Sequence, residues 1–149
     1  MLLSEVFDLR CIKPDLKSTA KPEVFKELIE TIIAVHPELD REEMFAVVNE
    51  RENKMTTSVI PGVAVPHGCY PGISDVIGAI GISRTGIAYN GDDNKPVYCV
   101  FLLLMGEESR EKHLHVLNKV FTVLNTPALA RIRAANSPQE VYDIMCRFH

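Results

Sequence analysis

The chain has 149 residues, 46% of them hydrophobic, and a formal net charge of −4. A chain of this length buries about 70% of its unfolded surface on folding, so we expect one domain spanning residues 1–149. The acidic balance leaves no basic field of the kind that a nucleic acid backbone or an anionic lipid surface attracts. Nucleic acid is therefore not expected as a partner.

The sequence also lacks the signals of a membrane-inserted or exported protein. Its longest apolar run, Val97–Met105, is far shorter than the about 20 residues of a membrane-spanning helix. The first residues carry no basic region followed by an apolar one. We therefore expect a cytoplasmic protein without direct membrane insertion. The absence of any C-x-x-C pair favours reduced thiols, although the even cysteine count leaves disulfides open among Cys11, Cys69, Cys99 and Cys146.

The first third of the chain predicts two helices. Apolar residues repeat at helical spacing within Lys21–His36, and Ser18 or Thr19 before Pro22 is a candidate cap. A second amphipathic pattern spans Asp40–Arg51, with acidic residues suited to a helix N-terminus. We expect this second helix to end near Arg51.

The rest of the chain predicts strands and then helices. Continuous apolar runs indicate strands covered on both faces, and Val97–Met105 is the best candidate for a central one. Residues Tyr89–Asn94 carry the chemistry of a turn. The other expected strands are Ser58–Val65 and Asp75–Ser83, and the expected helices are Glu108–Leu124, Pro127–Ala135 and a Ser137-capped segment, Ser137–Arg147. These elements predict an α/β fold, a single-domain sandwich in which a mixed β-sheet is flanked by α-helices on both faces.

One stretch, Gly62–Gly68, places a single histidine at the end of a short apolar strand. Pro66 removes a backbone donor and so interrupts the ladder, and Gly68 then lets the chain turn away. The His67 imidazole is therefore expected to be exposed at a strand end, where it can act as a nucleophile. Taken alone, the pattern favours an ordinary surface-turn histidine.

Two further residues bear on that choice. His113 lies at the N-terminal end of the apolar stripe of its helix, whereas His115 is rotated by about 200° toward the opposite face. Arg51 lies at the end of the second predicted helix, and its guanidinium matches phosphate oxygens. Each also has an ordinary structural interpretation, as a half-buried histidine bonded to a carbonyl and as a cation at a helix C-terminus.

Metal and thiol chemistry are not favoured. His113 and His115 are two residues apart on a helix and cannot face one ion, and Cys69 does not complete a structural zinc pattern. No cysteine-protease signature surrounds Cys69, and phosphate loops and dinucleotide fingerprints are absent from the sequence. We therefore expect no metal and no cofactor.

Taken in order, a set of spaced motifs resembles the type-2 EIIA family of the bacterial phosphotransferase system, the mannitol, fructose and nitrogen-regulatory class. The resemblance covers nearly the whole chain. Its motifs read Arg51-Glu52, Thr57, Gly62-Val63-Ala64-Val65-Pro66-His67 and His113-Leu114-His115-Val116-Leu117. The resemblance implies that His67 is the phosphoryl acceptor and forms a tele-phosphohistidine, and that His113 and Arg51 assist it. It also implies that Thr57 supports the phosphoryl site, with its hydroxyl or by fixing a loop.

The resemblance also implies partners. The donor would be a phosphorylated histidine of the small carrier protein HPr or of a nitrogen-branch equivalent, so neither nucleotide nor magnesium is needed. The acceptor would be a cysteine of a IIB component on a separate chain, for fructose- or mannitol-type sugar uptake. The alternative is a nitrogen-regulatory signalling protein whose phosphorylation state controls partner binding. A phosphorylation-silent binding domain is a third class, disfavoured because it has no need of all four residues.

An acidic chain must still dock these partners. An apolar surface around His67 would achieve this with little help from net charge. The residues expected to form it are Val65, Tyr70 and Ile73.

Overall fold

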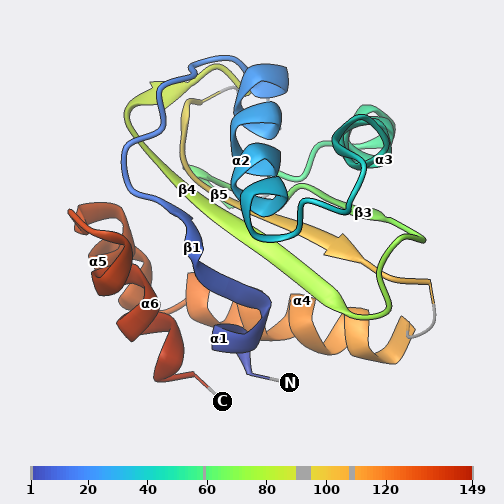
Figure 1. Ribbon diagram of the computed structural model, residues 1–149. Coiled ribbons are helices and arrows are strands. Elements are labelled where there is room, and N and C mark those ends of the chain that lie inside the picture. Colours follow the sequence, from blue (N-terminus) through green and yellow to red (C-terminus); the bar gives the residue numbers. More distant parts are fainter. Residues whose placement is uncertain (1, 59, 90–94, 108–109, 149) are drawn as a thin grey trace.

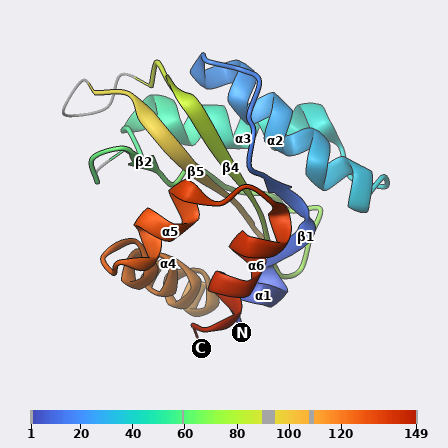
Figure 2. The same ribbon diagram turned by 90° about the vertical axis from the view of Figure 1, so that its left-hand side faces the viewer.

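The protein is a mixed sheet between two layers of helices (Figure 1). One face of the sheet carries α2 (Lys21–Val35) and α3 (Arg41–Lys54), and the other carries α4 (Arg110–Leu124), α5 (Ala128–Ala134) and α6 (Pro138–Cys146) (Figure 2). This arrangement confirms the predicted α/β sandwich with helices on both faces. The computed structural model describes residues 2–58, 60–89, 95–107 and 110–148.

Strand β5 (Val97–Met105) lies in the middle of the sheet, as predicted. Strand β4 (Val76–Ile87) pairs antiparallel with it on one side, and β1 (Phe7–Lys13) pairs parallel with β4. On the other side of β5, the short strands β2 (Val63–Ala64) and β3 (His67–Cys69) each pair parallel with it. The first residue of β3 therefore lies beside the carboxyl-terminal half of β5.

The hydrophobic core occupies both faces of β5. Phe101 and Leu103 belong to the cluster packed beneath α4, α5 and α6, whereas Val100 and Leu102 belong to the cluster beneath α2 and α3. All four side chains are fully buried, and burial of such a side chain stabilises the fold by about 1.5–3 kcal/mol. The continuous apolar run is thus a strand covered on both faces, as its pattern predicted.

Two helix starts follow their predicted chemistry and one does not. The Asp40 side chain caps α3 by accepting bonds from the backbone N–H groups of Glu42 and Glu43. The Ser137 side chain caps α6, which begins with a proline. Helix α2 instead begins after Ala20 with no side-chain cap. The cap predicted from Ser18 or Thr19 is therefore wrong, because the chain there is extended and bridges to the segment after β4.

Several predicted boundaries shift, and some elements are new. Helix α1 (Leu3–Val6) and strand β1 were not predicted. Strand β1 lies at the edge of the sheet, and its residues Leu9 and Arg10 are exposed. The strand expected over Ser58–Val65 contracts to β2 in the described residues, and position 59 lies outside them. Most of the turn predicted at Tyr89–Asn94 and the helix start predicted at Glu108 also lie outside the described residues.

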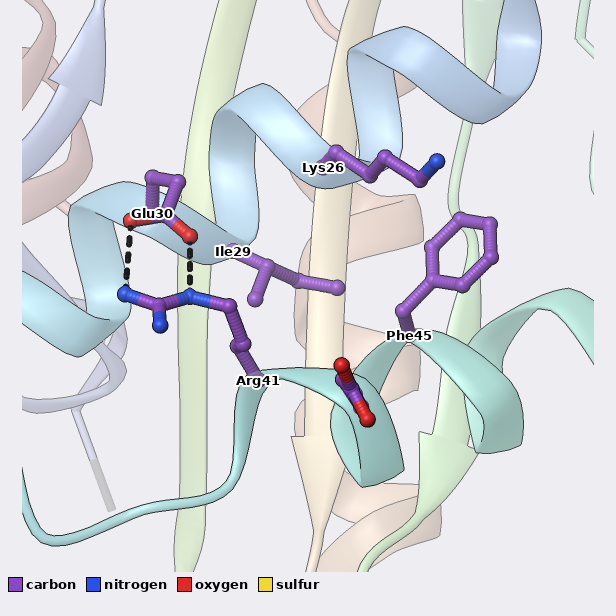
Figure 3. A pocket seen from close by; sticks show the side chains of 6 residues that line it. Lys26, Ile29, Glu30, Arg41 and Phe45 are labelled. Carbon is purple, nitrogen blue, oxygen red and sulfur yellow. Dashed lines mark hydrogen bonds and ion pairs between the residues drawn. The ribbon is translucent and has the colours of Figure 1, made fainter.

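Helices α2 and α3 are joined by an ion pair and a cation–π contact between their side chains (Figure 3). The Arg41 guanidinium donates to the Glu30 carboxylate, and the Lys26 ammonium lies 5.0 Å from the centre of the Phe45 ring. These residues line a hollow of about 380 Å³ that includes none of the predicted site residues. Exposed pairs of this kind contribute up to about 1 kcal/mol each, and they help to hold α3 in place.

Among the helices of the described segments, none has both the length and the apolar content needed to cross a membrane.

Candidate functional site

A cavity of about 440 Å³ brings together three of the four predicted site residues. His67 reaches it from β3, His113 from α4 and Arg51 from α3. These three residues come from separate parts of the chain and meet only because β3 lies between the two helical layers. The remaining lining residues are Val47, Glu50, Lys54, Gly68, Cys69, Met105 and Leu117.

The structure corrects the predicted setting of His67. His67 does not end a strand but begins β3, where it is paired with Leu103. Pro66 interrupts the ladder for only a short distance, because its carbonyl accepts a bond from the Leu103 N–H at 2.9 Å. Gly68 does not turn the chain away: a Cβ there would lie 2.9 Å from the Val47 carbonyl oxygen. Glycine is needed because α3 packs directly on β3, and His67 is half-buried as a result.

The imidazole of His67 is held in one tautomer. Its Nδ1 lies 2.7 Å from the Val65 carbonyl oxygen, and a carbonyl can only accept, so Nδ1 carries the proton. The lone pair is therefore on Nε2. Burial, with the positive charge of Arg51, lowers the pKa of His67 below its usual value against the opposing effects of the Val65 bond and Glu52. A neutral ring with a free Nε2 is the form that a nucleophile requires.

Arg51 lies in the last turn of α3, which continues to Lys54, three residues beyond the predicted end near Arg51. The guanidinium donates to the Met55 carbonyl at 3.0 Å. This bond caps the helix C-terminus, as the ordinary interpretation of the residue predicted, while the same side chain lines the cavity. The residues of α3 that line the cavity share one helical face: Val47, Glu50, Arg51 and Lys54.

His113 and His115 occupy the positions that the helical pattern predicted. His113 is half-buried and lines the cavity, whereas His115 is exposed. Leu114, between them, is 62% exposed. The histidine of α4 that lines the cavity is therefore His113.

Thr57 does not line the cavity. Its hydroxyl is buried and donates to the Glu52 carboxylate at 2.6 Å, and its backbone N–H donates to the same carboxylate at 3.0 Å. The hydroxyl of Tyr89 lies 2.8 Å from the Thr57 hydroxyl and 2.9 Å from Glu52. Of the two roles predicted for Thr57, a hydroxyl for the phosphoryl group or a fixed loop, the geometry favours the fixed loop.

Glu52 belongs to the Arg51-Glu52 motif, but sequence reasoning assigned it no role. Its side chain is 1% exposed and accepts a further bond from the Lys21 ammonium at 3.2 Å. Burial alone would raise the pKa of Glu52, but the bonds from Thr57 and Tyr89 and the charge of Lys21 hold that pKa below its usual value. A signal was present: Glu52 follows Met44 and Val48 at intervals of four residues, so it continues the buried face of α3.

The predicted docking surface is wrong. Val65 and Tyr70 are 2% and 3% exposed, and Ile73 is half-buried against the α2 and α3 side of the core. A partner cannot contact the first two. Large exposed apolar side chains do occur next to cavity residues, namely Met55 after Lys54 and Leu114 after His113, at 64% and 62% exposed.

The cavity shows no arrangement for a metal ion. Within the described segments, no group of three or more histidine, cysteine or acidic side chains is placed to bind one. Cys69 is an exposed free thiol at the cavity wall.

The arrangement around His67 is typical of a histidine that receives a phosphoryl group. A half-buried strand histidine with a free Nε2 faces an arginine and a second histidine, between two helical layers. The sequence model for "Phosphoenolpyruvate-dependent sugar phosphotransferase system, EIIA 2" matches residues 5–147. The chain therefore belongs to the type-2 EIIA family, as its motifs indicated.

Known proteins similar to this chain carry two kinds of name. The nitrogen regulatory protein of Klebsiella oxytoca is 31% identical over 147 residues, which cover 96% of this chain and 89% of that protein. The fructose-specific EIIA component of Haloferax volcanii is 27% identical over 148 residues, which cover 95% of this chain and 96% of that protein. The crystal structure of the nitrogen regulatory protein IIA-Ntr from Neisseria meningitidis superposes with a TM-score of 0.88 at 27% identity, over 96% of this chain and 98% of that one.

Proposed function

We propose that this protein is a histidine phosphocarrier, residues 1–149 forming one domain, in which Nε2 of His67 accepts a phosphoryl group. The donor is a phosphohistidine of HPr or of a nitrogen-branch equivalent. The observation that carries the proposal is the 2.7 Å bond between His67 Nδ1 and the Val65 carbonyl. It leaves Nε2 as the nitrogen with a lone pair.

The transfer balances without an added acid or base. The Nε2 lone pair of His67 forms a bond to phosphorus as the phosphorus–nitrogen bond of the donor breaks, and the donor ring keeps that electron pair. His67 retains its Nδ1 proton, so phosphorylation leaves positive charge on its ring. The Val65 carbonyl dipole, already bonded to Nδ1–H, stabilises that charge.

Arg51 and His113 stabilise the phosphoryl group in this proposal. A guanidinium has five N–H donors, so the bond to Met55 leaves capacity for phosphoryl oxygens. His113 supplies a ring N–H from the opposite helical layer. Charge spreads over the phosphoryl oxygens during transfer, and fixed donors at that point contribute most of the catalysis.

The next acceptor separates two candidate routes. In the sugar-uptake route, a cysteine of a IIB component on a separate chain takes the phosphoryl group from His67, and the similarity to a fructose-specific EIIA component supports this route. A nitrogen-regulatory route is favoured by the 31% identity to a nitrogen regulatory protein and by the TM-score of 0.88 with another. There, the phosphorylation state of His67 controls binding to a regulated partner. Rapid transfer from His67 to a fructose-type IIB domain supports the first route, and its absence supports the second.

The decisive experiment reconstitutes the donor chain. The protein is mixed with phosphoenolpyruvate, enzyme I and HPr, or its nitrogen-branch equivalents, and its intact mass is measured before and after acid treatment. We expect one acid-labile phosphate on the wild type and none on His67→Ala. Equal labelling of the two proteins would show that His67 is not the nucleophile.

A further inference from the structure

We propose that Glu52 and Tyr89 are positioning residues for phosphoryl transfer, which hold His67 in its Nδ1–H tautomer and Arg51 in the cavity. The inference rests on the proposed function, because it assigns to a buried network the task of preparing that site. Neither residue touches the phosphoryl group. Both act through Thr57, the backbone around it and the last turn of α3.

A continuous path of hydrogen bonds connects Glu52 to His67. The Glu52 carboxylate receives both the N–H and the hydroxyl of Thr57. The Thr57 carbonyl receives the Val65 N–H at 3.2 Å, and the Val65 carbonyl receives the His67 Nδ1–H at 2.7 Å. Each bond fixes the residue that makes the next one, so the position of Val65 depends on that of Thr57.

The same carboxylate fixes the rotation of α3. Successive residues on a helix point about 100° apart, so a side chain buried at Glu52 turns Arg51 away from the core. Arg51 accordingly lines the cavity while Glu52 contacts α2 through Lys21. A loss of the Glu52 bonds would free the last turn of α3 as well as the loop that carries Thr57.

Tyr89 adds contacts to the network from the segment that follows β4. It follows β4, is fully buried, and packs edge-on against Phe25 with 6.2 Å between the ring centres. The Lys21 ammonium lies 4.2 Å from the centre of the Tyr89 ring and also pairs with Glu52. Side chains from α2 and from the segment after β4 thus both contact the Glu52 carboxylate of α3. These contacts restrict the position of that carboxylate more than a single ion pair would.

The first test measures the tautomer of His67 in the isolated protein by ¹⁵N NMR. We expect the wild type to carry its proton on Nδ1, and Glu52→Gln, Tyr89→Phe and Thr57→Val to populate the Nε2–H form. Thr57→Ser keeps the hydroxyl and should retain the wild-type tautomer. Thr126→Val is the control, since the Thr126 hydroxyl is likewise bonded on two sides, to the Val123 carbonyl and the Ala128 N–H, but between α4 and α5 and outside this network.

The second test measures single-turnover transfer from phosphorylated HPr. For Glu52→Gln and Tyr89→Phe we expect the maximal rate to fall by about tenfold or more, because small misplacements of reacting groups cost that much. The half-saturating concentration of phosphorylated HPr should stay within about twofold, since docking is unaffected. Thr57→Ser should restore most of the rate lost in Thr57→Val.

The outcomes separate this inference from the proposed function. An unchanged tautomer and maximal rate in folded Glu52→Gln and Tyr89→Phe would overturn the positioning role. Should Glu52→Gln fail to fold, Tyr89→Phe, which keeps the ring and removes one hydroxyl, decides alone. If the wild type accepts no phosphoryl group, the proposed function fails, and the tautomer measurement still decides whether the network positions His67.

Discussion

The reactivity of His67 depends on which protonation state its surroundings favour. The half-buried ring donates from Nδ1 to Val65 and lies near the positive charge of Arg51. Burial and that charge both disfavour a second proton, so they lower the pKa of His67 and Nε2 keeps its lone pair to a lower pH than in a free histidine. The site therefore needs no separate base to prepare its nucleophile.

This balance predicts a pH dependence with a defined direction. Because the pKa of His67 is lowered from 6.5, the rate of phosphoryl acceptance should decline only as the pH falls below 6.5. Arg51→Gln removes a like charge and should raise the pKa of His67 while lowering the transfer rate. NMR titration of the His67 ring in both proteins measures the shift. A lower pKa in Arg51→Gln would contradict the electrostatic role of Arg51.

At the level of elements, the close contact of α3 with β3 shapes the cavity. A Cβ on residue 68 would lie 2.9 Å from the carbonyl carbon and oxygen of Val47 and 3.0 Å from the Val48 nitrogen. These are backbone atoms in the middle of a helix, so no side chain can rotate to make room. The packing distance between α3 and β3 is therefore set by Gly68.

Gly68→Ala should move α3 away from β3. We expect a loss of about 1–3 kcal/mol in the free energy of unfolding, as for other overpacked sites, and slower phosphoryl transfer because Arg51 and His67 lie on the two displaced elements. Urea denaturation and single-turnover transfer measure the two effects. A variant with wild-type stability and rate would show that the contact is looser than described.

Some elements could be predicted from local sequence patterns alone. The apolar run of β5 and the apolar stripe that contains His113 depend only on nearby residues, so residue spacing was enough to predict both. The resemblance then grouped Arg51, His67 and His113. Strand β3 was not predictable, since its pairing resumes after Pro66 only because β5 lies alongside. The partnership of Glu52 with Tyr89 joins residues 37 positions apart and leaves no periodic signal.

For the molecule as a whole, the attachment of α2 to β1 should govern acid stability. The Glu27 carboxylate accepts bonds from the Lys13 ammonium and from the backbone N–H groups of Lys17 and Ser18. Burial opposes the charge, but these bonds prevail and lower the pKa of Glu27 from 4.5 to about 2. Their stabilisation is present above pH 4.5 and is lost as the pH falls from there toward about 2.

Glu27→Gln should therefore flatten the dependence of stability on pH in that range. The variant should be less stable than the wild type at neutral pH and should approach it near the acid limit. Unfolding free energies from urea titrations across the range measure this. Glu23→Gln removes an equal charge from an exposed position on the same helix and serves as the control. Parallel pH profiles for the wild type and Glu27→Gln would exclude the assignment.

Partner docking is also a property of the whole surface. The net charge of −4 provides no general attraction for an acidic partner, whereas Met55 and Leu114 expose apolar side chains next to cavity-lining residues. Burying such side chains at an interface favours association.

We expect Leu114→Asp to raise the half-saturating concentration of phosphorylated HPr about tenfold or more, as for interface anchors, with little change in the maximal rate. Leu9→Asp is the matched control, since Leu9 is an exposed leucine on β1, at the opposite edge of the sheet from β3. Equal effects of the two substitutions would place docking elsewhere.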